Sequence, residues 1–334
     1  MLNGRQALGC LSPSCWGLFE KEKSMRRARA GSFRRVWKQH WQLYMFLLFP
    51  VAYIIIFKYV PMLGIQLAFK NFEYNLGIWK SPFVGLKHFY RFFRSYMFRR
   101  VITNTFRIAV TSILVEMPFT VIFALLLNSI TAARYKKLIQ TITYMPHFIS
   151  TVVVVGILMQ LFNPNVGVYG VIHKLLTGEK AQDLLANPNS FLSLYVGSGV
   201  WKTFGWGSIV YLAALTNVPP ELYEAAEIDG ATRLQRVYYI EVAAIVPIIV
   251  INLILSCGKI LNVGFQKVYL MQNDLNLRVS EVISTYVYKQ GLGNGGKSDY
   301  AYSTAVDLFN SVVGFVLVVS VNRISRRVTE TGLW

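Results

Sequence analysis

Residues 218–232 read Val218-Pro219-Pro220-Glu221-Leu222-Tyr223-Glu224-Ala225-Ala226-Glu227-Ile228-Asp229-Gly230-Ala231-Thr232, a polar interruption in a largely apolar chain. Prolines suit the first turn of a helix, and acids there complement the positive end of the helix dipole. The stretch therefore predicts a short helix. Gly230 can end it in the left-handed conformation, and Thr232 can cap a second short helix. An ordinary solvated loop is the alternative.

The composition around this stretch is that of a membrane protein. The chain has 334 residues, of which 54% are apolar and only 15% are charged, whereas about a quarter of residues are charged in soluble domains. The net charge of +18 does not indicate nucleic acid binding, because the basic residues cluster in the first forty positions and in short connectors. Charge placed in this way orients helices in a bilayer.

Six apolar segments are each close to the about 20 residues that a helix needs to cross a bilayer. They lie near 43–63, 103–129, 138–161, 190–215, 242–263 and 301–322. The sequence thus predicts an all-α integral membrane protein with a basic tail at 1–42, a six-span domain at 43–322 and a second tail at 323–334. The polar stretch at 217–241 precedes the fifth span.

Basic residues predict the orientation of these spans. The tail before the first span is rich in Lys and Arg, which places the N-terminus in the cytoplasm. Six crossings return the C-terminus to the same side, with 17 Lys and Arg inside and 13 outside. The excess is small because residues 70–100 are basic. Within them, residues 85–94 alternate aromatic and basic side chains, which predicts an amphipathic helix at the interface.

No catalytic or metal-binding pattern emerges. The four histidines have no metal spacing, and the three cysteines are expected to be free thiols. Residues 291–298 fit the phosphate-loop pattern G-x-x-x-x-G-K-[ST]. That motif works between a strand and a helix, whereas here no α/β context surrounds it. We interpret it as a glycine-rich outer loop.

The polar stretch resembles a known signature. Glu224-Ala225-Ala226, followed by Gly230 and Ile240, is similar to the EAA signature of permease subunits in binding-protein-dependent ABC importers, in the version of the carbohydrate-uptake branch. The resemblance covers about residues 40–334. One departure is visible, because the family pattern usually ends Ile-x-Leu-Pro, whereas this chain has Ala243 in place of the proline.

The resemblance implies a coupling helix pair that docks in a cleft of a separate cytoplasmic ATPase subunit. Glu224 would meet a basic group of the ATPase, Ala225 and Ala226 would allow close packing, and Gly230 would form the bend. ATP and magnesium would be bound by two ATPase subunits, so this chain would need no cofactor and would not be an enzyme. A second permease subunit, identical or homologous, and an extracytoplasmic solute-binding protein complete the expected complex in the bacterial inner membrane.

Aromatic and polar side chains in the later spans are candidates for a sugar pathway, because aromatic faces stack on sugar rings. The predicted pathway residues are Arg107, Trp201, Lys202, Trp206, Asn252, Lys259, Asp307 and Asn310. Four cations in the spans against two acids predict an anionic oligosaccharide, such as the oligouronates of alginate importers. Polar contacts between helices, and basic side chains that reach the interface, are the alternatives.

Some questions stay open at this point. A secondary transporter or channel, which would need no ATPase, is the main alternative function. The glycan, the identity of the second permease, and Met1 or Met25 as the start of the chain are not decided by the sequence.

Overall fold

The structure is a computed structural model that describes residues 40–258, 260–261, 263–293 and 298–329. It divides into two units, Met1–Gly64 and Ile65–Trp334. The first unit is helical throughout its described part, in a helix that runs His40–Phe69 and contains the predicted first span. The hydrogen-bonding pattern of this helix changes along its length. It is π-helical at Ile55–Tyr59 and a 3-10 helix at Val60–Phe69.

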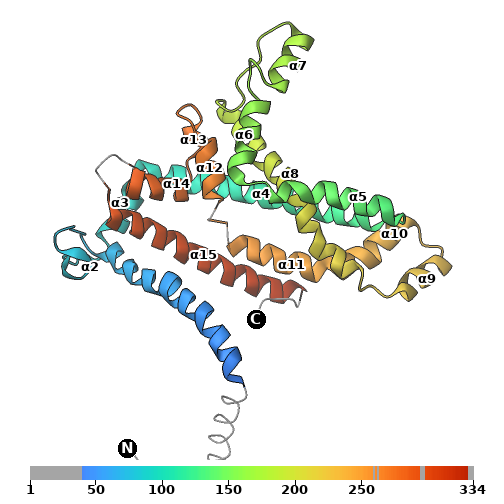
Figure 1. Cartoon of the computed structure of the whole chain (residues 1–334), viewed down its shortest axis with the longest axis horizontal. Coiled ribbons are helices and arrows are strands. Elements are labelled where there is room, and N and C mark those ends of the chain that lie inside the picture. The colour runs from blue at the N-terminus through green and yellow to red at the C-terminus, as the bar shows by residue number, and fades with distance from the viewer. Residues whose placement is uncertain (1–39, 259, 262, 294–297, 330–334) are drawn as a thin grey trace, which may run out of the picture. The chain divides into compact units, whose positions relative to one another are not determined.

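The second unit is built from helices (Figure 1). Its longer helices are α3 Lys87–Arg94, α4 Tyr96–Asn128, α5 Ala133–Tyr144, α6 Thr151–Leu161, α7 Val168–Thr177, α8 Pro188–Leu215, α9 Pro220–Ile228, α11 Ala243–Gly258 and α15 Tyr300–Thr329. Shorter ones are α2 Gly77–Lys80, α10 Arg233–Arg236, α12 Phe265–Met271, α13 Leu277–Ser280 and α14 Ile283–Tyr288. The π-helical segments η4 Val237–Val242 and η5 Lys289–Gly293 and the 3-10 turn η3 Met145–Phe148 complete it. The described residues form no strand beyond one isolated bridge, between Lys70 and Phe83.

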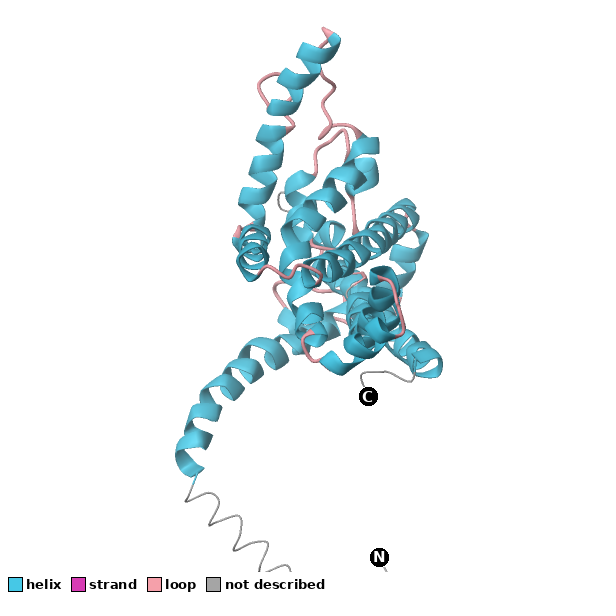
Figure 2. Cartoon of the chain, turned by 90° about the vertical axis from the view of Figure 1, so that its right-hand side faces the viewer, coloured by secondary structure: helices cyan, strands magenta, loops and turns pink. Residues whose placement is uncertain are grey.

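The long helices pack in pairs. Helix α4 lies along α8, and α11 lies along α15, while α3 and α14 cover the first turns of α15. Helices α6 and α7 extend away from the long helices (Figures 1 and 2). Two separate hydrophobic cores form. The larger contains Phe92, Ile108 and Phe191, and the smaller contains Leu127, Leu215 and Ile245.

By length and composition, four described helices can cross a membrane: His40–Phe69, Tyr96–Asn128, Arg233–Gly258 and Tyr300–Arg327. The all-α membrane class is thus confirmed, but the count of six spans is not. The prediction of a single span at 138–161 is wrong, because this segment consists of two helices that are bent by 99° relative to each other. Pro146 lies in the turn between them, and the Ser150 hydroxyl accepts a hydrogen bond from the Val153 N–H to start α6. A pair bent in this way crosses only as a broken span.

Helix α8, predicted as the span 190–215, has 28 residues and is long enough to cross. It is less apolar than the four helices above, so its composition alone does not identify it as a membrane span. Lys202 lowers its mean hydropathy, and so do its glycine, serine and threonine residues. They also let α8 approach its neighbours closely, so this helix buries more of its surface against protein than a lipid-facing span does.

The fifth span differs from the prediction at both ends. The predicted segment 242–263 ends five residues earlier, at Gly258, and its helix begins at Arg233. The predicted second short helix of the polar stretch is therefore not separate, because α10 continues through η4 into α11. The π-helical segment Val237–Val242 lies directly before Ala243, the position where the family proline is missing. Because residue 243 is alanine, its backbone N–H can donate a helical hydrogen bond, and the helix can continue through this position.

The amphipathic helix predicted at 85–94 exists as α3, but it does not lie free at an interface. Phe92 is 1% exposed and belongs to the larger core, and His88 is also buried. Arg91 on the exposed face forms an ion pair of 2.6 Å with Asp299, next to the start of α15. The aromatic side chains of this helix therefore anchor it to α15.

Candidate functional site

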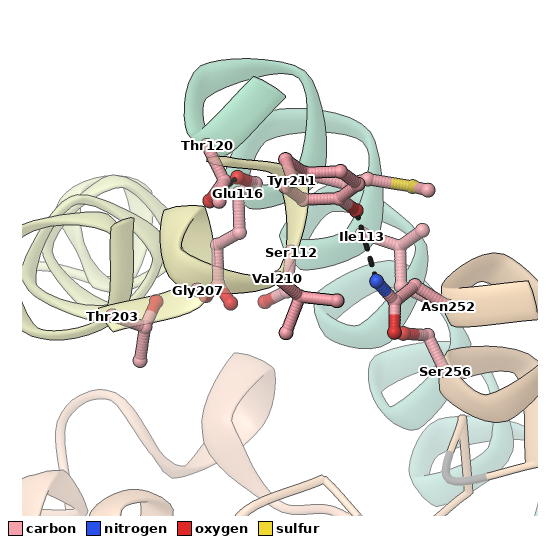
Figure 3. Close-up of a pocket in the computed structure, with 11 residues that line it drawn as sticks. Ser112, Ile113, Glu116, Thr120, Thr203, Gly207, Val210, Tyr211, Asn252 and Ser256 are labelled. Carbon is pink, nitrogen blue, oxygen red and sulfur yellow. Dashed lines mark hydrogen bonds between the residues drawn. The ribbon is translucent and has the colours of Figure 1, made fainter. Parts of the chain in front are cut away.

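A polar cavity of about 290 Å³ lies between α4, α8 and α11 (Figure 3). On α4, the lining residues Ser112, Glu116 and Thr120 recur at every fourth position and therefore share one face of the helix. The rest of the lining is Ile113, Met117, Thr203, Gly207, Val210, Tyr211, Asn252 and Ser256. Across it, the Asn252 amide donates a hydrogen bond of 3.2 Å to the Tyr211 hydroxyl.

The cavity separates the two cores. Although the half-buried Ile113 and Val121 also pack against the cores, the fully buried apolar residues on α4 end at Ala109 in the larger core and begin at Ala124 in the smaller core. The polar positions lie between these two residues. Because apolar surface fills the helix interfaces on either side, the polar segment is where the three helices leave room for a solute. This is the candidate pathway region of the chain.

Two half-buried groups of opposite charge lie beside α8, Glu116 in the lining of the cavity and Lys267 on α12. The Lys267 ammonium, on α12, donates a hydrogen bond of 2.6 Å to the Tyr195 carbonyl and lies 4.4 Å from the centre of the Tyr195 ring. Both Lys267 and the Glu116 carboxylate approach Gly199, where a Cβ atom would collide with the Glu116 side chain. The missing side chain at Gly199 therefore leaves room for a carboxylate from α4 and an ammonium from α12 on the same side of α8.

The predicted pathway residues do not gather at one place. Only Asn252 lines the polar cavity. Trp201 lines a separate, apolar cavity of about 480 Å³ between α6 and α8, and Asp307 lines a third of about 440 Å³ beside α14 and α15. Arg107 is exposed on α4, and Asn310 is buried in α15. Lys259 lies outside the described residues.

Two of these residues support the bend between α5 and α6. The Trp206 ring stacks on the His147 ring at 4.7 Å with an interplanar angle of 5°. The Lys202 ammonium donates to the Thr151 hydroxyl at 3.2 Å. Between them, Gly205 packs directly on the Thr143 backbone. In this structure α8 thus holds the broken third segment, and a pathway role of Lys202 and Trp206 stays a prediction.

Sequence reasoning did not assign Glu116 or Lys267 to the site. Glu116 was visible as an acid within a predicted span, and Lys267 counted only as an outer basic residue. The available signal was the four-residue spacing of Ser112, Glu116 and Thr120. No signal in the sequence links residue 116 to residue 267, because only the three-dimensional packing around Gly199 brings them together.

In the predicted coupling helix pair, the helix start, the bend and the cap are as predicted, although the second helix continues into α11. Helix α9 begins at Pro220, and Gly230 follows it with φ of +72°. Thr232 forms a capping box with Gln235, in which the Thr232 N–H donates to Gln235 Oε1 at 2.7 Å. These three features turn the chain sharply between α9 and α10.

The outer surface of this helix pair is free of contacts within the described chain. Glu224 and Ala225 are exposed and Ala226 is half-buried. Apolar side chains next to them are also exposed, with exposed fractions of 86% for Ile228 and 82% for Leu234. A surface that combines acids, small residues and exposed aliphatic groups is suited to a protein partner.

Comparison with known proteins agrees with this architecture. Residues 116–330 match the family of binding-protein-dependent transport system inner membrane components. Protein LplB of Bacillus subtilis (strain 168) is 43% identical over 292 residues, which cover 87% of this chain and 91% of LplB. The polygalacturonan/rhamnogalacturonan transport system permease protein YteP of the same organism is 41% identical over 292 residues, with coverage of 87% and 90%.

Two solved structures are also similar. One is a crystal structure of a bacterial alginate ABC transporter in complex with an alginate pentasaccharide-bound periplasmic protein, with a TM-score of 0.80, 38% identity and coverage of 89% of this chain and 98% of that chain. The other is a bacterial ABC transporter involved in the import of the acidic polysaccharide alginate, with a TM-score of 0.81, 37% identity and coverage of 89% and 99%. These matches confirm the resemblance drawn from the EAA signature and the prediction of a permease subunit that is not itself an enzyme. The chain belongs to the family of inner membrane components of binding-protein-dependent transport systems.

Proposed function

We propose that this chain is one permease subunit of an ATP-driven importer that passes an acidic oligosaccharide from a solute-binding protein into the cytoplasm. The observation that carries the proposal is the exposed coupling helix pair, α9 and α10, with its EAA residues on a free surface. One of two cytoplasmic ATPase subunits would dock there. A second permease subunit would supply the other half of the pathway, and both termini would lie in the cytoplasm.

The proposed substrate class rests on two kinds of support. YteP belongs to a polygalacturonan/rhamnogalacturonan transport system, and the two similar structures are alginate transporters. In this chain, Lys202 and Lys267 both contact α8 or its neighbours near the cavity, through the Thr151 hydroxyl and the Tyr195 carbonyl respectively. An excess of cations over acids along the pathway would favour a carboxylate-bearing sugar over a neutral one.

Acidic oligouronates should stimulate the ATPase activity of the complete reconstituted importer more than neutral oligosaccharides of equal length. In the triple variant Arg107→Gln, Lys202→Gln and Lys259→Gln, we expect the concentration for half-maximal stimulation to rise by about tenfold, because each ion pair that a solvated cation forms with a sugar carboxylate would be worth about 0.2–1 kcal/mol. Equal stimulation by acidic and neutral sugars would contradict the acidic substrate. Unchanged half-maximal stimulation in the variant would remove these three residues from the pathway.

Substitution at the coupling bend should uncouple transport from ATP hydrolysis. Gly230→Ala forces a side chain into the left-handed conformation at a cost of about 1–2 kcal/mol, and Glu224→Ala removes the acid expected to meet the ATPase. We expect each change to lower ATP-dependent uptake by about tenfold, measured with labelled oligosaccharide in proteoliposomes.

Gly178 provides the matched control for Gly230. It has φ of +75° at the end of α7, with no atom within 4 Å of an added Cβ, as is also the case at Gly230. Gly178→Ala therefore imposes the same backbone strain away from the coupling helix pair, and uptake should persist. If Gly230→Ala behaves like Gly178→Ala, or if the chain transports without any ATPase subunit, the importer proposal fails.

A further inference from the structure

A buried carboxylate lies at the base of the coupling helix pair. Glu241 is 6% exposed and belongs to the π-helical segment η4, between α10 and α11. Burial of a carboxylate is costly unless hydrogen bonds compensate for the lost water. Because the neighbouring positions in the sequence are apolar or aromatic, an acid at this place calls for an explanation beyond packing.

The explanation lies in the partners of one oxygen atom. Glu241 Oε1 accepts a hydrogen bond of 3.1 Å from the side-chain amide of Asn128, the last residue of α4. The same oxygen accepts a longer hydrogen bond of 3.5 Å from the Tyr223 hydroxyl on α9. Burial, and next the charge of Glu241, raise the pKa of Tyr223, so the hydroxyl keeps its proton and donates. Three segments of the chain therefore meet at Oε1.

This meeting point matters because α9 has few other contacts with the unit, among them an ion pair of 3.6 Å between Glu227 and Arg236 of α10. No other helix of the described unit packs extensively against α9. A cavity of about 470 Å³ lies beneath it, lined by Leu222 of α9, Asn217 of the preceding turn, and Tyr239 and Ala243 of the arm that leads into α11. The chain connects α9 to α8 and, through α10, to α11. It has no such covalent connection to the nearby end of α4, and the Glu241 carboxylate bridges that gap.

We propose that Glu241 is a positioning residue that carries a displacement of α9 to the inner end of α4 as well as to α11. The proposal rests on the proposed function, in which an ATPase displaces α9. Since α4 lines the polar cavity through Ser112, Glu116 and Thr120, the link connects the ATPase-facing surface to the helix that shapes the pathway. The second carboxylate oxygen, Oε2, is buried and receives no hydrogen bond from the described residues, so the link depends on Oε1.

The test is the amount of oligosaccharide transported per ATP hydrolysed by the complete importer in proteoliposomes. Glu241→Ala removes both hydrogen bonds and should lower this ratio by about tenfold, within the range usual for coupling between distant sites. Tyr223→Phe removes only one hydroxyl and should lower it by about threefold. Glu241→Gln keeps an oxygen at the same position and should retain most of the coupling.

Two comparisons separate this role from a merely structural one. The double variant Tyr223→Phe with Glu241→Ala should be no worse than Glu241→Ala alone, because both changes break the same link. Tyr238→Phe removes a hydroxyl from an exposed tyrosine of the same arm and should leave the ratio unchanged. Tyr223→Phe deletes one partly exposed group, so the test remains available even where Glu241→Ala lowers the yield of folded protein.

The inference is overturned if Glu241→Ala and Tyr223→Phe lower only the yield or the melting temperature while the ratio equals that of Tyr238→Phe. Additive losses in the double variant would also overturn it. A wild-type complex that shows no ATP-dependent uptake would instead overturn the proposed function, and this inference with it. The two failures are thus distinguished by the behaviour of the wild type.

Discussion

Replacing Gly205 by alanine is expected to destabilise this permease by about 2 kcal/mol or more, since an overpacked helix interface typically costs about 1–3 kcal/mol. An added Cβ atom at this position would collide with the carbonyl group of Thr143 on α5. A backbone carbonyl cannot rotate away as a side chain can, so α5 and α8 would have to separate. Such a separation would also disturb the stacking of Trp206 on His147, which holds the bend that follows α5.

Gly197 on the same helix is the matched control. An added Cβ atom there has no other atom within 4 Å. Alanine is favoured over glycine in a helix by about 1 kcal/mol, so Gly197→Ala should be neutral or slightly stabilising. Thermal unfolding of the purified protein in detergent measures both variants. Equal melting temperatures for the two would contradict the close packing of α5 on α8.

Replacement of Lys267 by methionine is expected to have the second large effect. It removes the cation that faces Glu116 and the donor to the Tyr195 carbonyl. Leaving a buried polar or charged group without its partner costs about 1–3 kcal/mol. Glu116→Gln should destabilise the protein by a similar amount, because Lys267 then keeps its charge in a half-buried position without the opposing carboxylate.

The double variant decides whether the two groups act as a pair. Glu116→Gln with Lys267→Met leaves neither charge behind, so its loss of stability should be smaller than the sum of the two single losses by about 0.5–3 kcal/mol. Denaturant-induced or thermal unfolding in lipid nanodiscs provides the measurement. Strictly additive losses would show that Gly199 separates the two side chains instead of allowing them to interact.

The parts of the fold that follow local rules were predictable. The start of α9 at Pro220, the turn at Gly230 and the cap at Thr232 all depend on residues within a few positions of one another. The apolar lengths of α4 and α15 are likewise local properties. For this reason the class of membrane protein and the start, turn and cap of the polar stretch followed from the sequence, and the EAA residues identified the family.

The parts that depend on distant contacts were not predictable. Hydropathy alone does not distinguish a straight span from the bent pair of α5 and α6, since both are apolar over the same length. The helix that continues from Arg233 through Ala243 into α11 joins two segments that hydropathy and turn signals separate. The candidate site was harder to predict, because Glu116, Gly199 and Lys267 are far apart in the sequence. Three of the residues that were chosen by chemical type alone, Asn252, Trp201 and Asp307, line three different cavities.

The modest hydropathy of α8 has a consequence for how the protein is made. A segment rich in glycine and hydroxyl side chains gains little from transfer into lipid, so the membrane by itself retains it weakly during synthesis. Helix α4, which precedes it in the chain and packs along its whole length, is strongly apolar. We expect α8 to integrate efficiently only after α4 is in place, so chains truncated or mutated in α4 should release α8 from the bilayer and become substrates for quality-control proteases.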